Sequence, residues 1–250
     1  MYQDLHSHTY YSFCGHDRPE DLIEAAIAGG IKVLGINDHN YGIGLCDESV
    51  LRFQTEDRAI SYGRSLRRYY DHINLLREKY KDDIIILRGI EINTFKNARY
   101  NLPPTEDISY FDYCLVEHLD LEKSHLDGDL FPFIERAKCK VGIAHTDMFT
   151  HIKNIGRDPL EYFSQMASLG AFWEMNVNYD SAHGYREHAY VKEFFSNPEQ
   201  QDIVRRSGVE ISIGFDSHLI SDYLPERIKE YCDKLEALDI PFAFAKELGI

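Results

Sequence analysis

Histidines and carboxylates follow short apolar segments at several points along this chain. The residues in these positions are His6, His8, Asp38, His39, Glu91, His118, His145, Asp216 and His218. The carboxyl ends of parallel strands meet at one face of an α/β barrel. Imidazole and carboxylate groups are also common ligands of transition-metal ions in proteins. The pattern therefore predicts that these side chains form one metal site at the carboxyl ends of the strands.

Several of these residues are spaced to share an ion. Residues two apart in a strand point to the same side, so His6 and His8 can reach one ion, as can Asp216 and His218. Glu91 lies between two isoleucines, which predicts that its carboxylate points into the fold. A buried carboxylate is costly unless it is paired or binds a metal, and its two oxygens can bridge two ions.

The other side chains that can bind metals are not expected to be metal ligands in this protein. Asp38 is expected to orient a neighbouring ligand instead of binding an ion itself. Cys14 is interpreted as a loop thiol, because the histidines already supply enough ligands. The histidines that fall in predicted helices or loops are interpreted as surface residues: His72, His125, His151, His183 and His188.

Seven strands are predicted to carry the site. They are expected at 1–8, 32–37, 84–91, 113–117, 141–145, 171–176 and 210–214. Helices are expected at 19–28, about 60–80, 158–169 and about 198–207, several of which begin at a proline and end at a glycine. Alternating strands and helices predict parallel β-α-β units. The stretches 40–58, 92–110 and 177–197 show no clear regular structure, and the first two are expected to lie beside the site.

Length and composition agree with a single barrel. The chain has 250 residues, of which 44% are hydrophobic, and an α/β barrel typically has about 250 residues. We therefore predict one barrel domain over residues 1–250. The sequence does not indicate an oligomeric state.

The charge balance argues against a nucleic-acid-binding protein. Lysine and arginine number 27 against 42 aspartate and glutamate residues, which gives a formal net charge of −15. A protein that binds phosphate backbones usually carries the opposite balance.

The longest apolar run, 25–36, is too short for a membrane helix, which needs about 20 residues. Five scattered cysteines suggest no disulfide framework. A cytoplasmic location without a membrane partner is therefore expected.

The ordered set of motifs resembles one known family. Asp4-Leu5-His6-Ser7-His8-Thr9, Asn37-Asp38-His39-Asn40, Gly89-Ile90-Glu91, His118, Ala144-His145 and Gly214-Phe215-Asp216-Ser217-His218 are similar to the motifs of the PHP (polymerase and histidinol phosphatase) phosphoesterases. The resemblance covers about residues 1–220. It implies an α/β fold of the TIM-like type, a distorted seven-stranded (β/α)7 barrel.

The resemblance also implies a site for three divalent ions, with zinc, manganese or iron favoured by the mixed nitrogen and oxygen ligands. The first ion would bind His6, His8, Glu91 and Asp216; the second Glu91, His118 and His145; the third His16, His39 and His218. Cys14-Gly15-His16 resembles the histidinol-phosphatase branch. Glu117 departs from the family, which usually has an uncharged residue there. Strand alternation is expected to turn Glu117 outward.

This chemistry predicts a phosphomonoesterase in which a metal-bound hydroxide attacks phosphorus. Glu91, Asp216 and His218 are the expected catalytic residues, with Asp216 or a site histidine as proton donor. The expected partner is a small phosphorylated substrate, and histidinol phosphate is the first candidate. A nucleotide or sugar phosphatase, a metal-dependent amide hydrolase and a non-catalytic binding barrel remain alternatives.

Positively charged loop residues are candidates for binding the phosphate group. They are Lys153, Arg157 and Arg186, and an ordinary surface role remains open for each. Asn176 at the end of the sixth predicted strand occupies a position similar to that of a polar residue in the family. It is expected to contact the substrate or a ligand.

Overall fold

The computed structural model describes residues 1–45, 56–95, 102, 106–119, 124, 126 and 130–249. Within these residues the strands are β1 (Gln3–Asp4), β2 (Val33–Ile36), β3 (Ile85–Arg88), β4 (Glu91–Ile92), β5 (Tyr113–Val116), β6 (Lys140–Ile143), β7 (Phe172–Asn176) and β8 (Glu210–Gly214). The helices are α1 (Pro19–Ala28), α3 (Glu56–Tyr80), α4 (Leu130–Ala137), α5 (Met148–Asn154), α6 (Pro159–Ser168), α7 (Ala189–Ser196), α8 (Pro198–Ser207), α9 (Pro225–Ala237), α10 (Ala245–Leu248) and the 3-10 helix η1 (Ile220–Asp222).

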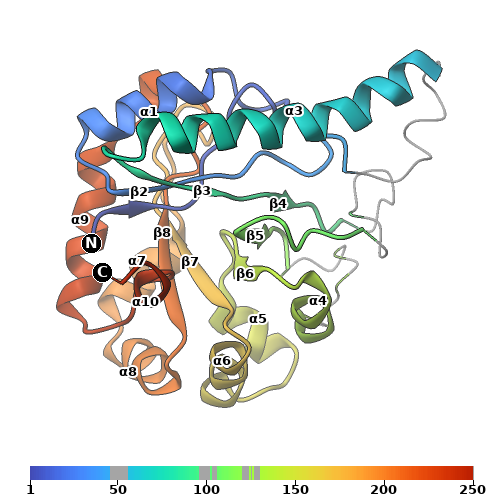
Figure 1. The fold of residues 1–250 in the computed structure, drawn as a ribbon. Coiled ribbons are helices and arrows are strands. Elements are labelled where there is room, and N and C mark those ends of the chain that lie inside the picture. Colours follow the sequence, from blue (N-terminus) through green and yellow to red (C-terminus); the bar gives the residue numbers. More distant parts are fainter. Residues whose placement is uncertain are drawn as a thin grey trace.

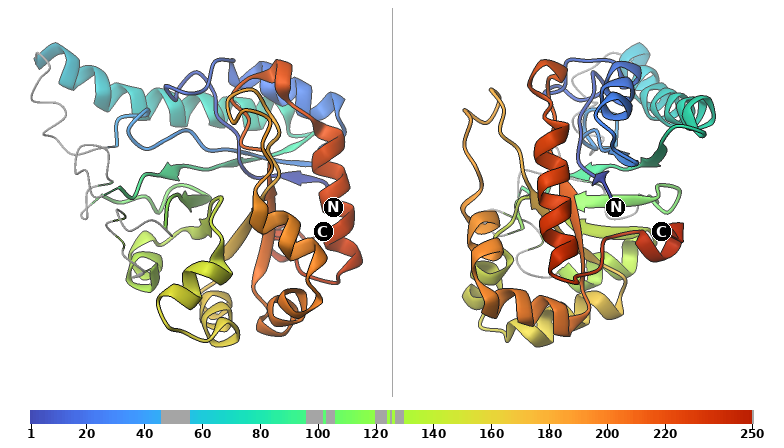
Figure 2. Two further views of the ribbon diagram at one scale, coloured as in Figure 1. Left: turned by 180° about the vertical axis from the view of Figure 1, so that it is seen from behind. Right: turned by 90° about the vertical axis from the view of Figure 1, so that its left-hand side faces the viewer.

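The strands form two parallel sheets. One has the order β1-β2-β3 and the other the order β4-β5-β6-β7-β8. Helices α1 and α3 lie along the β1–β3 side of the molecule, and α5, α6 and α8 lie on the opposite side (Figure 1). Figure 2 shows the same arrangement from behind and from one side, with the two chain ends close together. The α/β class and the parallel strands are confirmed, whereas a closed seven-stranded barrel is not.

The strand count differs because the segment predicted at 84–91 is divided between the two sheets. The backbone N–H of Gly89 donates to the carbonyl of Ile36 in β2, whereas the carbonyl of Ile90 accepts from Leu115 in β5; both bonds are 2.8 Å long. The chain therefore leaves the first sheet and enters the second at this point. Glycine is required at 89, because a Cβ there would lie 2.1 Å from Nδ2 of Asn37.

Isolated bridges connect the two sheets just beyond the strand ends. Ser7 pairs with Ser217, and His39 pairs with Glu91. The N–H of Leu5 also donates to the carbonyl of Ile213 at 2.9 Å. These contacts bring the carboxyl ends of β1 and β8, and those of β2 and β4, next to each other. Six of the predicted site residues lie at or just beyond these ends: His6, His8, His39, Glu91, Asp216 and His218.

The core has two clusters that separate inward-facing from outward-facing strand positions. Inward residues such as Leu5, Tyr113, Leu115 and Phe172 pack together in one cluster. The alternate residues, such as Val116, pack with the helices in a second, larger cluster. An inward position at the carboxyl end of a strand therefore faces the space above the first cluster.

The four predicted helices are confirmed, although α3 begins earlier than expected. Side chains of Asp158 and Asn197 accept hydrogen bonds from the first turns of α6 and α8, and Gly208 ends α8 with φ 73°. One helix was not predicted: α7 lies within the stretch 177–197, for which no regular structure was expected. Buried Tyr190, Val191 and Phe194 lie on one face of α7 and stabilise it by packing.

Parts of the other two irregular stretches, 40–58 and 92–110, lie outside the described residues. Among the residues that are described, no helix has both the length and the apolar composition needed to cross a membrane.

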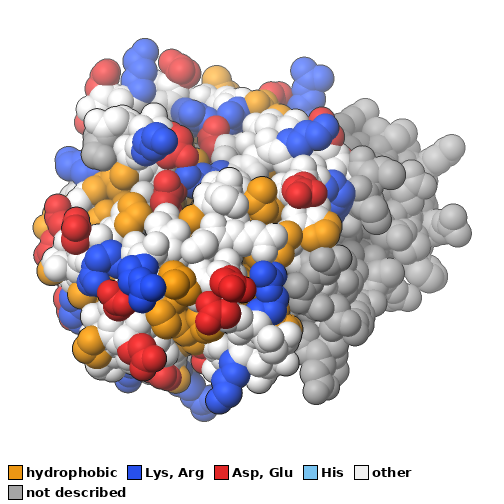
Figure 3. Space-filling view, turned by 90° about the horizontal axis from the view of Figure 1, so that it is seen from below, with side chains coloured by type: hydrophobic (Ala, Val, Ile, Leu, Met, Phe, Trp, Pro, Cys, Tyr) orange, Lys and Arg blue, Asp and Glu red, His pale blue; other side chains and the backbone are white. Residues whose placement is uncertain are grey.

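On the face shown in Figure 3, lysine and arginine side chains are interspersed with aspartate and glutamate, and no single basic patch is visible there.

Candidate metal centre

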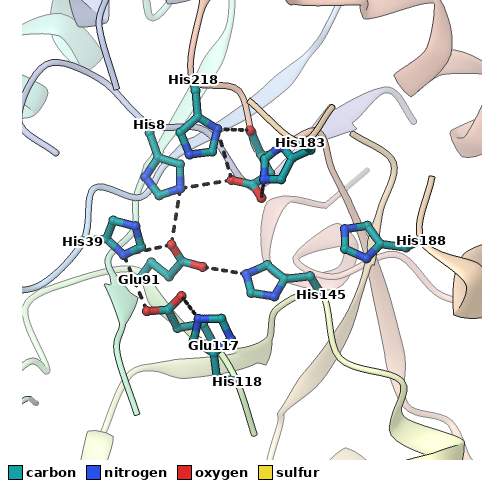
Figure 4. Close-up of a pocket in the computed structure, with 10 residues that line it drawn as sticks. His8, His39, Glu91, Glu117, His118, His145, His183, His188 and His218 are labelled. Carbon is teal, nitrogen blue, oxygen red and sulfur yellow. Dashed lines mark hydrogen bonds and ion pairs between the residues drawn. The ribbon is translucent and has the colours of Figure 1, made fainter. Parts of the chain in front are cut away.

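Ten side chains line a pocket at the carboxyl ends of the strands (Figure 4). The pocket has a volume of about 270 Å³. Its residues are His8, His39, Glu91, Glu117, His118, His145, His183, His188, Asp216 and His218. Seven are histidines and three are carboxylates, and no lysine or arginine occurs in this lining. Most of the residues predicted from strand ends are therefore brought together.

His6 and His8 face the same two carboxylates. Nε2 of His8 lies 3.1 Å from Oδ1 of Asp216 and 3.3 Å from Oε2 of Glu91. Nε2 of His6 lies 3.4 Å from Oδ1 of Asp216 and 3.3 Å from Oε1 of Glu91. The two Nε2 atoms are 3.2 Å apart. Two ring nitrogens and two carboxylates thus converge, as the spacing of two residues predicted.

Glu91 lies at the centre of the pocket and is 1% exposed. Its Oε2 lies 3.1 Å from Nδ1 of His39, and its Oε1 lies 3.2 Å from Nε2 of His145. Together with the contacts to His6 and His8, each oxygen faces two histidines. A carboxylate placed in this way can bridge two ions.

Glu117 points into the pocket, so the prediction that it faces outward is wrong. Tyr113 and Leu115 belong to the inner cluster, and alternation along β5 continues the inward direction to Glu117. Its Oε2 lies 2.9 Å from Nε2 of His118, and its Oε1 lies 3.8 Å from Nδ1 of His39. The pocket therefore contains a carboxylate that the motifs did not indicate.

Three pocket residues have a left-handed backbone. The φ angle is 58° at His118, 26° at His145 and 57° at Asp216. Such a conformation costs about 1–3 kcal/mol at a residue other than glycine, and it is often found at functional sites. The N–H of Asp216 donates to the carbonyl of His6 at 2.6 Å, and the N–H of His145 donates to Oε2 of Glu174 at 2.8 Å. These bonds hold the turns that follow β8 and β6.

The buried charges shift the pKa values of several groups. Burial raises the pKa of Glu91, but the charges of His6 and His39 outweigh burial and hold this pKa well below its usual range. Burial lowers the pKa of His145, but the hydrogen bond and charge of Glu91 raise it to about 9. Burial likewise lowers the pKa of His218, but the neighbouring carboxylate of Asp180 helps raise it to about 9. Protonated histidines thus balance the carboxylates, a role that bound cations can take over.

Glu174 in β7 supports the site, although the sequence reasoning did not single it out. It is fully buried. Its Oε1 lies 2.7 Å from Nδ1 of His6, and its Oε2 accepts the N–H of His145. Metal-binding histidines commonly have such a partner on their second nitrogen. A charged residue two positions after inward-facing Phe172 was the available signal in the sequence.

Asp38 supports the loop that follows His8. Its Oδ1 accepts the N–H groups of Thr9 at 2.8 Å and Ser12 at 3.0 Å. Oγ of Ser12 in turn accepts the N–H of His39 at 2.8 Å and lies 3.4 Å from Nδ1 of His8. Asp38 therefore acts on these two histidines indirectly, through Ser12.

The same loop places Cys14, and not His16, beside the pocket. The side chain of His16 is exposed, and only its N–H contacts the site, by donating to the carbonyl of His218 at 3.1 Å. Sγ of Cys14 lies within 4.8 Å of ring nitrogens of His8 and His218. Burial raises the pKa of the Cys14 thiol, but hydrogen bonds from His218 and His39 lower it to about 6. The structure thus does not bring His16 to the cluster.

Two histidines between β7 and α7 line the pocket, so their interpretation as surface residues is wrong. Nδ1 of His183 lies 2.7 Å from Oδ1 of Asp180, and its Nε2 lies 3.4 Å from Oδ2 of Asp216. The ring of His188 is stacked near that of His145, with centroids 6.2 Å apart. The aspartate three residues before His183 was the only local signal.

Of the other three histidines interpreted as surface residues, two are described, and neither lines the pocket. His72 is partly buried, with Nδ1 3.0 Å from Oη of Tyr11 and Nε2 3.2 Å from Oε1 of Glu20. His151 is 4% exposed in α5, so a surface position is wrong for this residue too. His125 lies outside the described residues.

The predicted phosphate-binding cations do not reach the pocket. The side chains of Lys153, Arg157 and Arg186 are exposed, and Arg157 donates to Oε1 of Gln165 at 3.1 Å. Asn176, in contrast, is 1% exposed and donates to Oδ2 of Asp216 at 3.3 Å.

The donor set fits divalent metal ions. Groups of three ligand atoms within 4.8 Å of one another are formed by His6, His8 and Asp216; by His8, His39 and Glu91; by Glu91, Glu117 and His145; and by Asp180, His183 and His218. Oε1 of Glu117 and Oδ2 of Asp180 are buried and accept no hydrogen bond from the described residues. Buried acceptors without partners are costly, and cations would satisfy them.

Comparisons with known proteins identify a matching family model and a similar fold. The sequence model of the PHP domain matches residues 4–238. No curated protein is similar in sequence at a significant level. The structure is similar to that of histidinol phosphate phosphatase from Lactococcus lactis subsp. lactis Il1403, complexed with zinc, L-histidinol and phosphate. The TM-score is 0.55, the identity is 17%, and the match covers 95% of this chain and 94% of that one.

Other solved structures are more distant. A histidinol phosphatase of Listeria monocytogenes, described as putative, has a TM-score of 0.40 and 16% identity, with 96% of this chain and 93% of that chain covered. A chain of an archaeal ribonuclease P bound to mature tRNA has a TM-score of 0.42 and 13% identity, with 94% and 89% covered.

Proposed function

We propose, from the premise that this chain belongs to the PHP domain family, that it is a metal-dependent phosphoesterase that hydrolyses a small phosphomonoester. One observation supports the proposal most strongly. Seven histidines and three carboxylates, with no lysine or arginine among them, line a single pocket at the strand ends. Such a set has little use in a packed core, but it can hold several cations that bind and activate a phosphate ester.

We infer sites for up to three divalent ions, with zinc, manganese or iron as candidates. His6, His8, Glu91 and Asp216 would hold the first, and Glu91 with His145 the second. His39, His218 and a residue of the loop after His8 would hold the third. When bound, such ions lower the pKa of water and neutralise charge on phosphate oxygens.

The protein's own side chains would position the substrate and supply a proton. His183 and His188 face the pocket where the predicted arginines do not, so imidazole N–H groups are the available donors to phosphate oxygens. Asp180 fixes the ring of His183 through Nδ1 at 2.7 Å, and Nε2 is directed toward Asp216. This Asp–His pair can protonate the leaving oxygen. Asn176 holds the Asp216 carboxylate in place.

The pocket favours a small substrate. Its volume of about 270 Å³ is near the lower end of the range of roughly 300–1,000 Å³ for ligand pockets. The Lactococcus enzyme of similar fold was crystallised with L-histidinol and phosphate. Histidinol phosphate is therefore the first substrate to test, and nucleotide and sugar monophosphates are the next.

Steady-state kinetics test the proposal. The purified chain is loaded with zinc, manganese or iron, and kcat/KM is measured for histidinol phosphate, a nucleoside monophosphate, a sugar phosphate and a phosphodiester. We expect monoesters to be hydrolysed much faster than the diester, and Glu91→Gln to abolish turnover. No phosphate release from any ester by the metal-loaded protein would refute a phosphoesterase. A tenfold preference for a nucleotide, about 1.4 kcal/mol, would change the substrate only.

A further inference from the structure

We propose that Glu117 is a metal ligand, which together with Glu91 and His145 gives one ion of the centre a second carboxylate and makes its position more favourable to manganese, relative to zinc, than it would be without Glu117. This inference rests on the proposed function, because it concerns an ion of that same centre. It adds a ligand that the strand-end motifs did not indicate.

The first support is the position of Glu117. Its backbone is fixed at the end of β5, where its N–H donates to the carbonyl of Ile92 at 3.2 Å and its carbonyl accepts from Oγ1 of Thr94 at 2.7 Å. The side chain is 6% exposed and points into the pocket beside Glu91 and His39 (Figure 4). A ligand atom of Glu117 lies within 4.8 Å of ligand atoms of Glu91 and His145.

The second support is an unsatisfied oxygen. Oε1 of Glu117 is buried and accepts no hydrogen bond from the described residues. Nδ1 of His39 lies 3.8 Å from this oxygen and is closer to Oε2 of Glu91, at 3.1 Å. A buried carboxylate oxygen without a partner costs free energy. A cation between the two glutamates would satisfy it.

The third support is the repulsion between carboxylates. Glu91, Glu117 and Asp216 all line one small pocket, and the histidines between them are shared. Two carboxylates that approach one another repel unless a proton or a cation lies between them. Nε2 of His118 lies 2.9 Å from Oε2 of Glu117, but the side chain of His118 is 30% exposed, so solvent weakens this contact.

The choice of metal follows from the ligands. Carboxylate oxygens favour harder ions such as manganese, whereas imidazole suits zinc well. With Glu117, an ion held by Glu91 and His145 has two carboxylates to one imidazole, so Glu117 should strengthen the binding of manganese there more than the binding of zinc. Replacing Glu117 by the neutral, isosteric glutamine should therefore weaken manganese binding more than zinc binding.

Metal titration of the full-length protein tests the inference without relying on activity. Metal-free wild type and Glu117→Gln are titrated with manganese, followed by electron paramagnetic resonance, and with zinc, followed by competition with a chromophoric chelator. Loss of an outer partner of a metal ligand already weakens binding about 10- to 100-fold. We therefore expect one manganese equivalent to bind at least about tenfold more weakly in E117Q, with a smaller change for zinc. Glu161→Gln, an exposed glutamate of α6, should match wild type.

Thermal unfolding provides a second readout. Without metal, E117Q should be as stable as wild type or more stable, because a repelling charge is removed. With manganese, its gain in Tm should be smaller than that of wild type. A lower Tm in both states, with unchanged manganese binding, would show that Glu117 is only the structural partner of His118 and would overturn the inference. If wild type bound no divalent ion at all, the proposed function itself would fail.

Discussion

Oε1 of Glu174 lies 2.7 Å from Nδ1 of His6, and both side chains are fully buried. The charge of Glu174 favours a proton on Nδ1, so Nε2, which faces Glu91 and Asp216, is the nitrogen of His6 that can give up its proton and bind an ion. The relationship therefore determines which nitrogen of His6 can bind an ion.

Replacing Glu174 by glutamine should weaken metal binding. The glutamine amide can donate to Nδ1, which favours the tautomer with a proton on Nε2, and that tautomer cannot bind an ion there. We expect metal affinity to fall about 10- to 100-fold. Metal content after dialysis against a chelator measures the effect, with E161Q as the control. Unchanged retention in E174Q would mean that another contact sets the His6 tautomer.

Metal binding should release protons near neutral pH. The pKa values of His145 and His218 are raised to about 9 in the metal-free protein, so both are largely protonated at pH 7 and must lose protons to bind ions. Apparent affinity should thus rise between pH 7 and pH 9. Calorimetry in two buffers of different ionisation enthalpy counts the protons released. Equal heats in both buffers would contradict the expectation.

The same shifts predict the pH dependence of stability without metal. A histidine whose pKa is raised in the folded state stabilises the fold at pH values below its unfolded pKa of about 6.5, and this contribution is lost as pH rises through the folded pKa. The Tm of the chelator-treated protein should therefore fall between pH 6.5 and pH 9. A constant or rising Tm over this window would count against protonated histidines in the pocket.

His183→Asn should slow hydrolysis of alkyl phosphates about 100-fold or more, because it removes the proposed proton donor. The effect should be much smaller for p-nitrophenyl phosphate, whose leaving group needs no proton. Asp180→Asn should have a similar but weaker effect. The metal content of the His183→Asn variant should remain normal. Loss of one ion from this variant would show that His183 is a metal ligand and not the proton donor. Arg157→Ala, which alters an exposed cation outside the pocket, is the matched control and should leave KM unchanged.

Cys14 should react with iodoacetamide in the metal-free protein. Its pKa is lowered to about 6, so the thiolate predominates at pH 7, and the labelling rate should fall as pH drops below about 6. Buried Cys232, whose pKa is raised to about 12, should remain unlabelled and serves as an internal reference. Added zinc should slow labelling of Cys14 if the thiol lies beside the ions. Mass spectrometry of tryptic peptides distinguishes the two cysteines.

Much of the centre could be predicted from the sequence because strand geometry is local. Alternation and strand ends are visible in the order of residues, and that order alone suffices to place His6, His8, Glu91 and Asp216 together. Their contacts of 3.1–3.4 Å confirm this. The family motifs carry the same information, since each one is a strand end.

Tertiary structure decided the features that depend on packing between distant segments. The inward direction of Glu117 depends on which alternate face of β5 packs against the inner cluster, and the apolar sequence of β5 fits either face. The division of 84–91 between two sheets depends on the partners of Gly89 and Ile90. His183 and Cys14 lie in loops without periodicity, so only the folded chain could show that these side chains reach the pocket and that His16 does not.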